Sequence, residues 1–585
     1  MRAAPPAGAR AAGRLRPVLS RVLDERAWPL RVGLLLALAA ALLLPGLGQA
    51  PLERAEIYFL DGARSMLERQ DLLVPYYRGE PFFDKPPLTY WLMAAAFRVL
   101  GFDPGAARVV PAVAALLVLL ATLWLGRILF DRRTAFAGAV VLATTGGFIG
   151  FGRIAMSDML LALWSTLAMA IALRALRADA HPAWPVALAA VLGLGFLTKG
   201  PIALLLPGLG FAWLAWTRRA DVPRVRAWIA GVAVVVFAAV ALGWFVAVER
   251  RLGWGPLAHF FLRENLQRFA ADTYDAQRPF WYYVPTFLAV GAPWSLFLPL
   301  AAWRALGRED GASRFLLAWL ALMLVPLSLS RGKIDYYLLP LYPAASLVVA
   351  RLFTSVPWRA LERSWTRVVL AIAVVALALM PAFLFGQPEQ WVPPRVALGA
   401  MSALMGLAVL ACVVAAVRPS AARTLATLAL SAALVIGTLG SLVVPAFHAA
   451  QPLRQVVEDV KREQRYRSDA SVVACADPLR VQRDLLFHAR TVMEERCDLW
   501  ALASSSHPFL LLLDAEQRRS LLAGEGVREV ARYRYLPATA LTLAGLLDPP
   551  APSEMTLAAN FPTDDPVAET KRKRERKRAL RDANE

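Results

Sequence analysis

Several short segments of this chain carry acidic and basic side chains that could together handle a phosphate or move a proton. Segment 82–87 places Asp84 beside Lys85 in a turn stiffened by two prolines. The other candidates are Glu56, Asp61, Arg153, Asp158, Lys199, Arg331, Lys333 and Asp335. Carboxylates accept protons, and ammonium and guanidinium groups bind phosphate, so these residue types indicate acid–base or phosphate chemistry.

These charged segments lie between long apolar blocks. Hydrophobic residues make up 58% of the 585 residues, and charged residues make up only 18%. A helix needs about 20 mainly apolar residues to cross a bilayer. About thirteen blocks have this character, near 30–50, 107–129, 134–152, 156–177, 183–198, 201–217, 227–247, 281–303, 314–330, 334–353, 366–386, 396–417 and 421–445. The sequence therefore predicts an all-α polytopic membrane bundle.

The distribution of arginine predicts how the bundle is oriented. The net charge is +20, but the arginine clusters fall in every second loop, as expected when basic loops stay in the cytoplasm. The external parts are then the loops near 51–106, 152–156, 248–280, 331–333 and 386–395, and the chain after 446. The candidate residues lie either in the first external loop or at the external ends of the predicted spans. This pattern argues against nucleic acid as a partner.

The chain divides into four parts. Residues 1–29 are a basic cytoplasmic segment, and residues 30–446 form the transmembrane domain with external loops 51–106 and 248–280. Residues 447–545 mix short apolar runs with helix-like stretches, which is typical of a small soluble α/β domain. Residues 546–585 include the basic run 571–578 and are predicted to be a disordered tail.

The first external loop is too patterned to be a linker. Apolar residues recur at helical spacing over 55–67, which predicts an amphipathic helix at the membrane surface. A second helix is expected after Pro87, because proline is accepted at a helix start. Asp84 and Lys85 lie between these two helices, at the level of the membrane.

Charged residues at membrane depth indicate a water-filled cavity or a paired partner, because each costs about 2.5–3.5 kcal/mol on insertion scales. We expect the candidates to line one outward-facing cavity that suits a lipid-linked phosphate. Structural alternatives stay open for several of them. Asp158 could pair with Arg153 at a helix start. Lys199 and Lys333 could extend to the interface, and Glu56 could face solvent.

Absent motifs disfavour some chemistries. The chain has no G-x-x-x-x-G-K-[ST] phosphate loop for ATP, and no H-E-x-x-H motif or Cys/His cluster for zinc. A divalent cation held by carboxylates stays possible, so no cofactor is assigned. Cys412 falls in an apolar block. Cys475 and Cys497 fall in the external C-terminal region, where a disulfide and two free thiols are equal alternatives.

The order of these motifs resembles that of the bacterial polyprenyl-phosphate-dependent glycosyltransferases, which include the lipid A aminoarabinose transferases and related protein mannosyltransferases. The resemblance rests on segments 56–67, 71–75, 79–91, 153–158, 197–201, 264–269, 279–283 and 331–340, and so covers most of 30–350. It implies a C-type glycosyltransferase fold in a bacterial inner membrane, with the active site facing the periplasm.

The resemblance also implies roles for particular residues. Lys85 would hold the phosphate of a polyprenyl-phosphate-linked sugar, helped by Arg268 or Lys333. Arg268 and Tyr337 would line the donor cavity, and Asp158 would be an active-site acid. The expected reaction is a single in-line displacement that inverts the anomeric carbon, in which the cations stabilise the departing phosphate.

One departure from the family concerns the proton acceptor. The family usually has an Asp-Glu pair where this chain has Ala55 and Glu56. If the missing Asp is the family's base, then Glu56 or Asp158 must replace it, and an acceptor that is itself a phosphate would need little base catalysis.

The acceptor expected from the resemblance is an envelope lipid such as lipid A, a glycan or a protein. The alternative function is a flippase or secondary transporter for lipid-linked sugars. A transporter would place ionisable residues deep inside the spans and would show matching halves with broken helices. The charged candidates cluster at one face instead, which favours the transferase.

Overall fold

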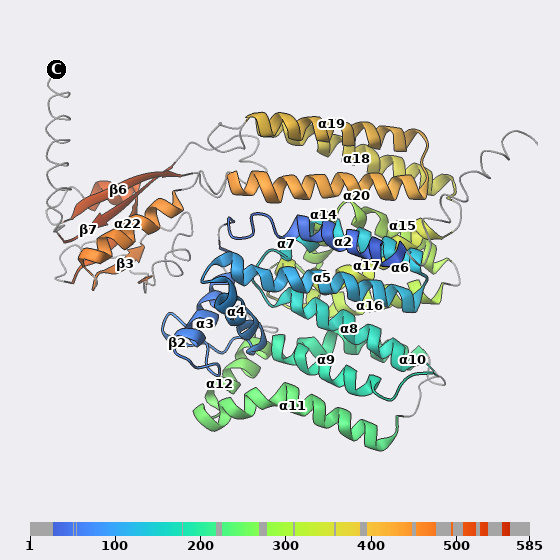
Figure 1. Cartoon of the computed structure of the whole chain (residues 1–585), viewed down its shortest axis with the longest axis horizontal. Helices are drawn as coiled ribbons and strands as arrows, with labels where there is room; N and C mark the ends of the chain where they lie inside the picture. Colours follow the sequence, from blue (N-terminus) through green and yellow to red (C-terminus); the bar gives the residue numbers. More distant parts are fainter. Residues whose placement is uncertain are drawn as a thin grey trace, which may run out of the picture.

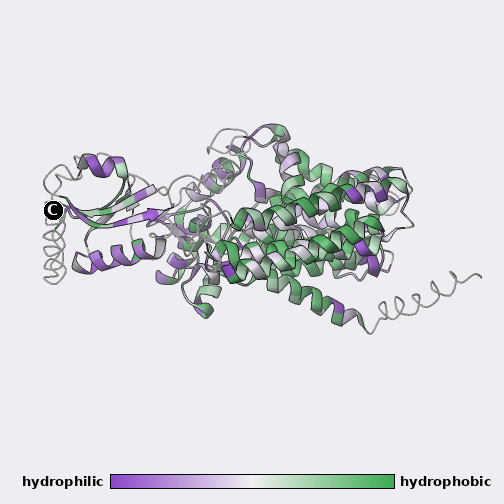
Figure 2. Ribbon diagram, turned by 90° about the horizontal axis from the view of Figure 1, so that it is seen from above, coloured by the Kyte–Doolittle hydropathy of each residue, from purple (hydrophilic) through white to green (hydrophobic). Residues whose placement is uncertain are grey.

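Long helices run side by side through most of the molecule, and a small sheet domain lies at one end of them (Figure 1). The computed structural model describes residues 27–50, 52–53, 55–177, 179–217, 225–267, 278–307, 310–355, 358–385, 395–446, 452–467, 469–474, 493–494, 507–521, 527–535 and 553–561. The apolar bundle is green in Figure 2, and the purple, hydrophilic residues concentrate in the sheet domain and at the ends of the helices.

The bundle consists of mainly apolar helices, several of which begin at an aspartate cap. Asp103, Asp131 and Asp310 each accept a backbone N–H from the first turn that follows them. The bounds are α2 (Trp28–Leu43), α5 (Pro104–Leu129), α6 (Arg132–Ala143), α7 (Gly146–Phe151), α8 (Asp158–Ala175), α9 (Trp184–Lys199), α10 (Ile202–Thr217), α11 (Ala227–Leu252), η3 (Phe280–Tyr282), α14 (Tyr283–Val290), η4 (Trp294–Phe297), α15 (Leu298–Leu306), α16 (Gly311–Leu329), η5 (Asp335–Leu341), α17 (Tyr342–Thr354), α18 (Ala360–Phe385), α19 (Arg395–Val417), α20 (Ala421–Thr438) and η7 (Leu439–Val443).

The structure confirms the prediction of a polytopic membrane bundle. All thirteen apolar blocks are helical. Within the described part of the chain, eight helices are long and apolar enough to cross a membrane, or nine if the pair Phe280–Val290 and Trp294–Leu306, bent by 110°, is one span. The other predicted spans are shorter helices, and block 134–152 is divided into α6 and α7.

Burial separates the central helices from those that face lipid. The most apolar windows of α8 and of η5 with α17 are 78% and 83% buried. The corresponding windows of α11, α18 and α19 are only 22–28% buried, although they are the most hydrophobic of the set. An apolar helix that is exposed along most of its length needs lipid around it, so α11, α18 and α19 form the outside of the bundle.

An external layer covers one end of the bundle. It contains α3 (Glu56–Glu68), the strands β1 (Tyr76–Tyr77) and β2 (Glu80–Pro81), α4 (Leu88–Leu100), α12 (Gly255–Ala258) and the π-helix η2 (His259–Gln267). The expected helices over 55–67 and after Pro87 are therefore present as α3 and α4. Arg78 and Gly79 have positive φ angles of 53° and 85°, which let the chain reverse between the two short strands.

The C-terminal domain is a mixed sheet with helices, as predicted from its composition. Its elements are α22 (Leu453–Tyr466), β3 (Ser471–Ala474), β4 (Met493–Glu494), β5 (Phe509–Asp514), α25 (Ala515–Leu521), β6 (Arg528–Tyr535) and β7 (Ser553–Ala559). The strand order is β4-β3-β5-β7-β6; β3 runs parallel to β4 and β5, and β7 runs antiparallel to β5 and β6. The valines of α22 pack on one face of this sheet.

Strand β7 corrects the predicted end of this domain. It lies beyond residue 545, inside the segment 546–585 that the sequence predicts to be disordered, yet it pairs with strands on both sides. The prolines before it obscured a short alternation of Met555, Leu557 and Ala559, which are buried. The basic run 571–578, Cys475 and Cys497 lie outside the described residues, and Cys412 is buried and free.

Candidate active site

A cavity of about 150 Å³, lined by both charged and apolar residues, lies between the external layer and the ends of the central helices. A single water needs roughly 10–15 Å³ of such space, so the cavity has the size of a ligand site. Its polar wall is formed by Asp84, Lys85, Asp158, Lys199, Glu264, Asn265, Ser330 and Tyr337. Its apolar wall is formed by Leu161, Ile202, Leu205, Leu206, Phe260, Pro326 and Leu327. One half therefore suits a charged head group, and the other half suits hydrocarbon.

Lys85 extends from the turn before α4 to the π-helix η2. Its Nζ donates to Glu264 Oε2 at 3.2 Å and to the carbonyl oxygen of Asp84 at 2.7 Å. The Glu264 side chain is 1% exposed and that of Lys85 is 19% exposed. The cation is therefore partly open to a ligand, while its carboxylate partner is held inside the protein.

The Lys85 turn is positioned by its own sequence and by η2. Pro86 and Pro87 follow the lysine, and Pro87 caps α4, so the backbone has little freedom there. The Asp84 carboxylate lies 2.9 Å from the Nε2 atom of His259 on η2. This contact joins residues 175 positions apart, and it fixes the external layer against the cavity.

Asp158 and Lys199 form an ion pair on the opposite wall. Asp158 is the first residue of α8, where the helix dipole favours a carboxylate, and it is 2% exposed. Lys199 donates to Asp158 and lies 4.4 Å from the centre of the Tyr337 ring. Asp158 therefore pairs with Lys199. The alternative that it pairs with Arg153 at the helix start is wrong.

Gly200 explains why the chain turns at Lys199. Its φ angle is +69°, which ends α9, and a Cβ at this position would lie 2.5 Å from Phe260 of η2. Glycine is therefore needed both for the backbone conformation and for the close approach of η2. This packing brings Lys199 and Glu264 to the same cavity.

Glu56 lies away from the cavity, in a buried pair with Arg108. Its two carboxylate oxygens accept hydrogen bonds from Arg108 at 2.8 and 2.7 Å, and from the backbone N–H groups of Ala155 and Glu53 at 2.6 and 2.7 Å. Glu56 is 0% exposed and Arg108 is 2% exposed. Glu56 therefore neither faces solvent nor lines the cavity.

The loop before Asp158 is held from both sides. Glu56 binds the N–H of Ala155, and Arg153 donates to the carbonyl oxygens of Leu42, Leu43, Pro45 and Gly440. Arg153 thus caps the end of α2, and burial lowers the pKa of its guanidinium. Arg153 is therefore placed to fix the loop that presents Asp158, and it does not line the cavity.

Three other candidates also lie off the cavity wall. Asp61 pairs with Arg64 and accepts the N–H of Arg78, so it braces the first external loop. Burial raises the pKa of the Asp61 carboxyl, and the nearby Arg64 opposes the shift. Arg331 is exposed. Lys333 is 5% exposed and donates to the carbonyl oxygen of Ser330; burial lowers the pKa of its ammonium.

Arg268 lies outside the described residues, so its predicted role stays a prediction. The structure adds two residues that the sequence did not single out as site residues, His259 and Glu264. Both lie on η2, and their partners Asp84 and Lys85 are about 180 positions earlier in the chain. Both lie in the second external loop, and Glu264 also begins segment 264–269, which belongs to the family resemblance.

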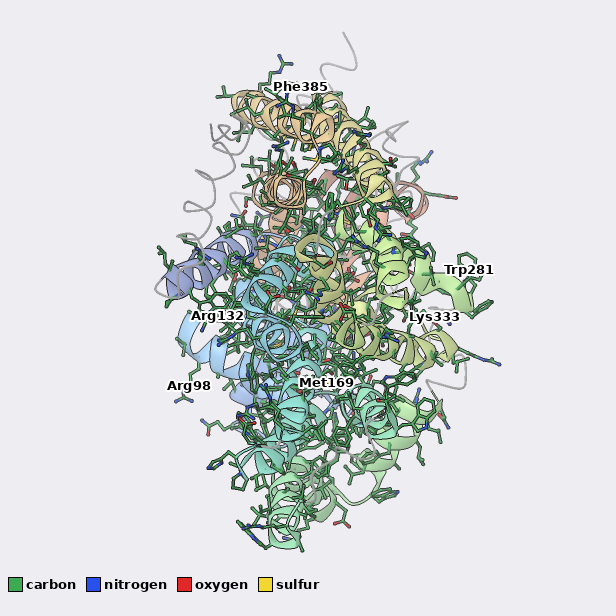
Figure 3. All side chains as sticks on the ribbon, turned by 90° about the vertical axis from the view of Figure 1, so that its right-hand side faces the viewer. Arg98, Arg132, Met169, Trp281, Lys333 and Phe385 are labelled. Carbon is green, nitrogen blue, oxygen red and sulfur yellow. The ribbon has the colours of Figure 1, made fainter. Side chains whose placement is uncertain are left out.

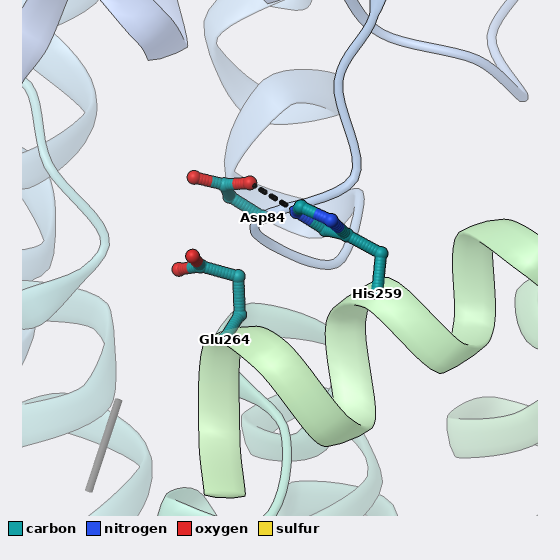
Figure 4. A group of neighbouring side chains, drawn as sticks. All are labelled: Asp84, His259 and Glu264. Atoms are coloured by element: carbon teal, nitrogen blue, oxygen red, sulfur yellow. Dashed lines mark hydrogen bonds and ion pairs between the residues drawn. The ribbon is translucent and has the colours of Figure 1, made fainter. Parts of the chain in front are cut away.

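Asp84, His259 and Glu264 could hold a divalent cation. Figure 4 shows the three side chains converging from η2 and from the turn before α4. Their ligand atoms all lie within 4.8 Å of one another, and one imidazole with two carboxylates is a suitable donor set for zinc or a related ion. An ion bound there would share Glu264 with Lys85 and would fasten η2 to the Lys85 turn.

Comparison with known proteins finds one matching family model and several relatives in sequence. The family model for dolichyl-phosphate-mannose-protein mannosyltransferase matches residues 84–244. An undecaprenyl phosphate-alpha-4-amino-4-deoxy-L-arabinose arabinosyl transferase of Pseudomonas savastanoi pv. phaseolicola is 34% identical over 297 residues, which are 49% of this chain and 54% of that protein. The protein of the same name from Pectobacterium carotovorum subsp. carotovorum is 30% identical over 368 residues, or 59% of this chain and 64% of that protein.

The whole architecture has a solved counterpart. The crystal structure of ArnT from Cupriavidus metallidurans bound to undecaprenyl phosphate matches 92% of this chain and 99% of its own with a TM-score of 0.69, at 18% sequence identity. The chain has the C-type glycosyltransferase fold. The apo form of the same protein matches equally well, with a TM-score of 0.69 over 91% of this chain.

These matches fit the resemblance seen in the motifs. Within the C-type glycosyltransferase fold, the chain resembles the polyprenyl-phosphate-dependent aminoarabinose transferases, and it is a multi-pass membrane protein. In sequence, however, it spans only about half to two thirds of the length of the curated relatives that it matches.

Proposed function

We propose that this protein is a membrane glycosyltransferase that moves a sugar from a polyprenyl-phosphate donor to an envelope acceptor at the periplasmic face. The observation that carries the proposal is the cavity in which Lys85, Lys199 and Asp158 meet beside an apolar wall. An amphipathic donor with a phosphate between a sugar and a hydrocarbon chain matches both halves of this cavity. The aminoarabinose transferases in the comparison carry undecaprenyl phosphate in their name.

The donor phosphate would bind at Lys85. This ammonium is the more exposed member of its ion pair, and the turn that carries it is fixed by two prolines and by His259. Negative charge grows on the phosphate as the bond to the sugar breaks, so a fixed cation stabilises the transition state more than the bound donor. Tyr337 and Lys199 complete the polar wall, and Arg268 is a further candidate for the donor.

Asp158 is the better candidate for the proton acceptor than Glu56. Glu56 already accepts four hydrogen bonds, including two from Arg108, and lies away from the cavity. Asp158 faces the cavity and has Lys199 beside it to stabilise its negative charge. A direct attack of the acceptor on the anomeric carbon, with Asp158 accepting the proton, gives inversion of configuration.

The acceptor class is proposed from the relatives and from the location of the cavity. An envelope lipid such as lipid A, a glycan or a protein would reach it from the periplasm, on the side of the external layer. The alternative, a flippase for lipid-linked sugars, would need ionisable groups along a path through the bundle. The charged residues of the cavity lie at the external ends of α8 and α9 and in the loops above them.

The test is transfer of sugar from a polyprenyl-phosphate donor by the full chain in proteoliposomes. Replacing Lys85 by Ala should reduce transfer by at least about 100-fold, because one preorganised donor to a developing anion is worth about 10²–10³ in rate. Lys461→Ala, on the exposed face of α22, removes the same charge far from the cavity and should leave transfer unchanged.

Two results would contradict the proposal. Full transfer by Lys85→Ala, at a protein level and melting temperature equal to those of the parent, would remove Lys85 from the site. Movement of the labelled lipid-linked sugar across the vesicle membrane without any transfer product would favour the flippase.

A further inference from the structure

One side of the cavity is formed by a short segment between α16 and η5. Ser330, Gly332 and Tyr337 line the cavity, and all three belong to residues 330–337, which we call the 330–337 segment. Residues 330–334 lie between α16 and η5, outside any helix. Backbone groups outside helices and strands need other hydrogen-bond partners when they are buried. The contacts that hold this segment therefore decide the shape of one cavity wall.

Two consecutive tyrosines hold the second half of the segment. Tyr282 ends η3, and its hydroxyl donates to the carboxylate of Asp335. Tyr283 begins α14 and is 0% exposed, and its hydroxyl accepts the backbone N–H of Ile334 at 3.2 Å. Neighbouring positions of the segment are thus fixed by neighbouring side chains of one other stretch of chain.

The first half of the segment is held by its own side chains. The ammonium of Lys333 donates to the carbonyl oxygen of Ser330, and the Ser330 hydroxyl donates to the carbonyl oxygen of Gly332 at 3.3 Å. Lys333 is 5% exposed, so its ammonium stays within the segment. Figure 3 labels Lys333 and Trp281, the residue before Tyr282, on the same side of the bundle. The segment therefore has a defined shape before a donor binds.

The segment reaches the charged groups of the cavity through Tyr337. The N–H of Tyr337 donates to the carbonyl oxygen of Ile334 at 3.1 Å, so Tyr337 is tied to Ile334. The ring of Tyr337 lies 4.4 Å from the ammonium of Lys199, which is paired with Asp158. An aromatic ring attracts a cation, so the position of the ring helps to set the position of this ammonium. A chain of contacts thus runs from Tyr283 to Asp158.

We propose that Tyr282 and Tyr283 are positioning residues for the transfer reaction. Neither lines the cavity. Both hold the 330–337 segment, so that Tyr337 keeps the ammonium of Lys199 in place. This inference rests on the proposed function, in which that ammonium stabilises the negative charge of the proton acceptor. The chemical step then depends on two hydroxyl groups that lie outside the cavity.

Donor binding depends on these tyrosines much less. Lys85, which would bind the donor phosphate, is held by Glu264 of η2 and by the two prolines that follow it. These contacts do not pass through the 330–337 segment. Loss of the two hydroxyls is therefore expected to lower kcat and to leave the KM for the donor nearly unchanged.

The test is the transfer assay with the full chain in proteoliposomes, applied to the double variant Tyr282→Phe/Tyr283→Phe. Both rings stay, and both hydrogen bonds to the segment are lost. We expect kcat to fall by about 10–100-fold with the donor KM within about twofold of the parent, because a misplacement of about 1 Å can cost about 10²-fold. Tyr342→Phe is the matched control, since Tyr342 of α17 stacks on Phe287 of α14 and its hydroxyl has no hydrogen-bond partner among the described residues. Its kcat should equal that of the parent.

A combined variant separates positioning from a general structural effect. Tyr337→Leu removes the ring through which the tyrosines act, so adding Tyr282→Phe/Tyr283→Phe to it should cause little further loss of kcat. If the two losses multiply, the tyrosines act elsewhere and the proposal is overturned. It is also overturned if the double variant keeps the kcat of the parent, or loses donor affinity in place of kcat. Tyr282→Phe alone leaves the buried Tyr283 intact, and it is measured by the same criteria if the double variant does not fold.

The same assay distinguishes this inference from the proposed function. A parent protein that transfers no sugar would contradict the proposed function itself. An active parent together with an unaffected double variant would contradict only the positioning role.

Discussion

Each carboxylate on the wall of the cavity has a nitrogen partner: Asp84 has His259, Glu264 has Lys85, and Asp158 has Lys199. The cations are thus already engaged before a donor arrives. A bound phosphate would compete with Glu264 for Lys85 and would draw Lys199 away from Asp158. Within the proposed function, Asp158 is the proton acceptor on this wall, and Lys199 is its partner.

Replacement of Asp158 by Asn tests this role. The variant keeps the size and polarity of the side chain and loses the proton acceptor. We expect kcat to fall by about 10²–10⁴-fold, the usual contribution of a general base, with the KM for the donor nearly unchanged. Asp179→Asn is the matched control, because Asp179 is exposed, with a side-chain exposure of 73%, at the opposite end of α8.

A loss below tenfold in the Asp158→Asn variant would contradict the assignment. It would also be informative, because an acceptor that is already an anion needs no proton acceptor. The same steady-state assay in parent, variant and control gives both kcat and KM, and it separates a chemical role of Asp158 from a role in binding.

At the scale of elements, the sequence predicts the helices better than the site. The apolar blocks had the length that a span requires, so all thirteen ranges contain helix. The ion pair of Glu56 could not be predicted from the apolar blocks. Its partner Arg108 lies at the start of one block, where a charged residue usually marks only the end of a span. His259 was one of five scattered histidines, and only its place in the second external loop set it apart. Partners of this kind depend on how α5, α3 and η2 pack, which periodicity does not specify.

The pair of Glu56 and Arg108 joins the external layer to the bundle. Arg108 lies in the first turns of α5 and donates to Glu56 at the start of α3, and also to the carbonyl oxygens of Leu47 and Ala50. Arg108→Met would leave the buried Glu56 carboxylate without its counter-charge. We expect the free energy of unfolding to fall by about 3–5 kcal/mol, measured by denaturant titration in detergent micelles.

Two further variants separate this effect from a general loss of arginine. Arg98→Met changes an exposed side chain on α4 and should alter stability by no more than about 0.5 kcal/mol. The double variant Glu56→Leu/Arg108→Met removes both charges and should recover much of the lost stability. An Arg108→Met protein as stable as the parent would show that the pair does not hold α3 to α5.

At the scale of the whole molecule, the membrane bundle and the C-terminal sheet domain have separate cores. The bundle core runs from α2 to α20, whereas the sheet domain is packed around the valines of α22 and the strand residues. The matches in sequence to curated relatives cover 49–59% of this chain, and the family model ends at residue 244. The fold match covers 92% of it.

The position of β7 makes the sheet domain sensitive to where the chain is cut. β7 lies between β5 and β6, and β6 has no other partner strand within the described residues. A chain that ends after residue 545 would lose β7, leave β6 unpaired and expose Leu510 and Leu512 of β5. A chain that ends after residue 561 would keep every described strand. We expect the first truncation to make the sheet domain sensitive to protease while the bundle stays folded, and the second to behave as the full chain does. The two truncated proteins differ in the described strands only by β7, whose loss leaves β6 unpaired and one edge of β5 uncovered. Equal protease resistance of the two would therefore show that the sheet is stable without β7.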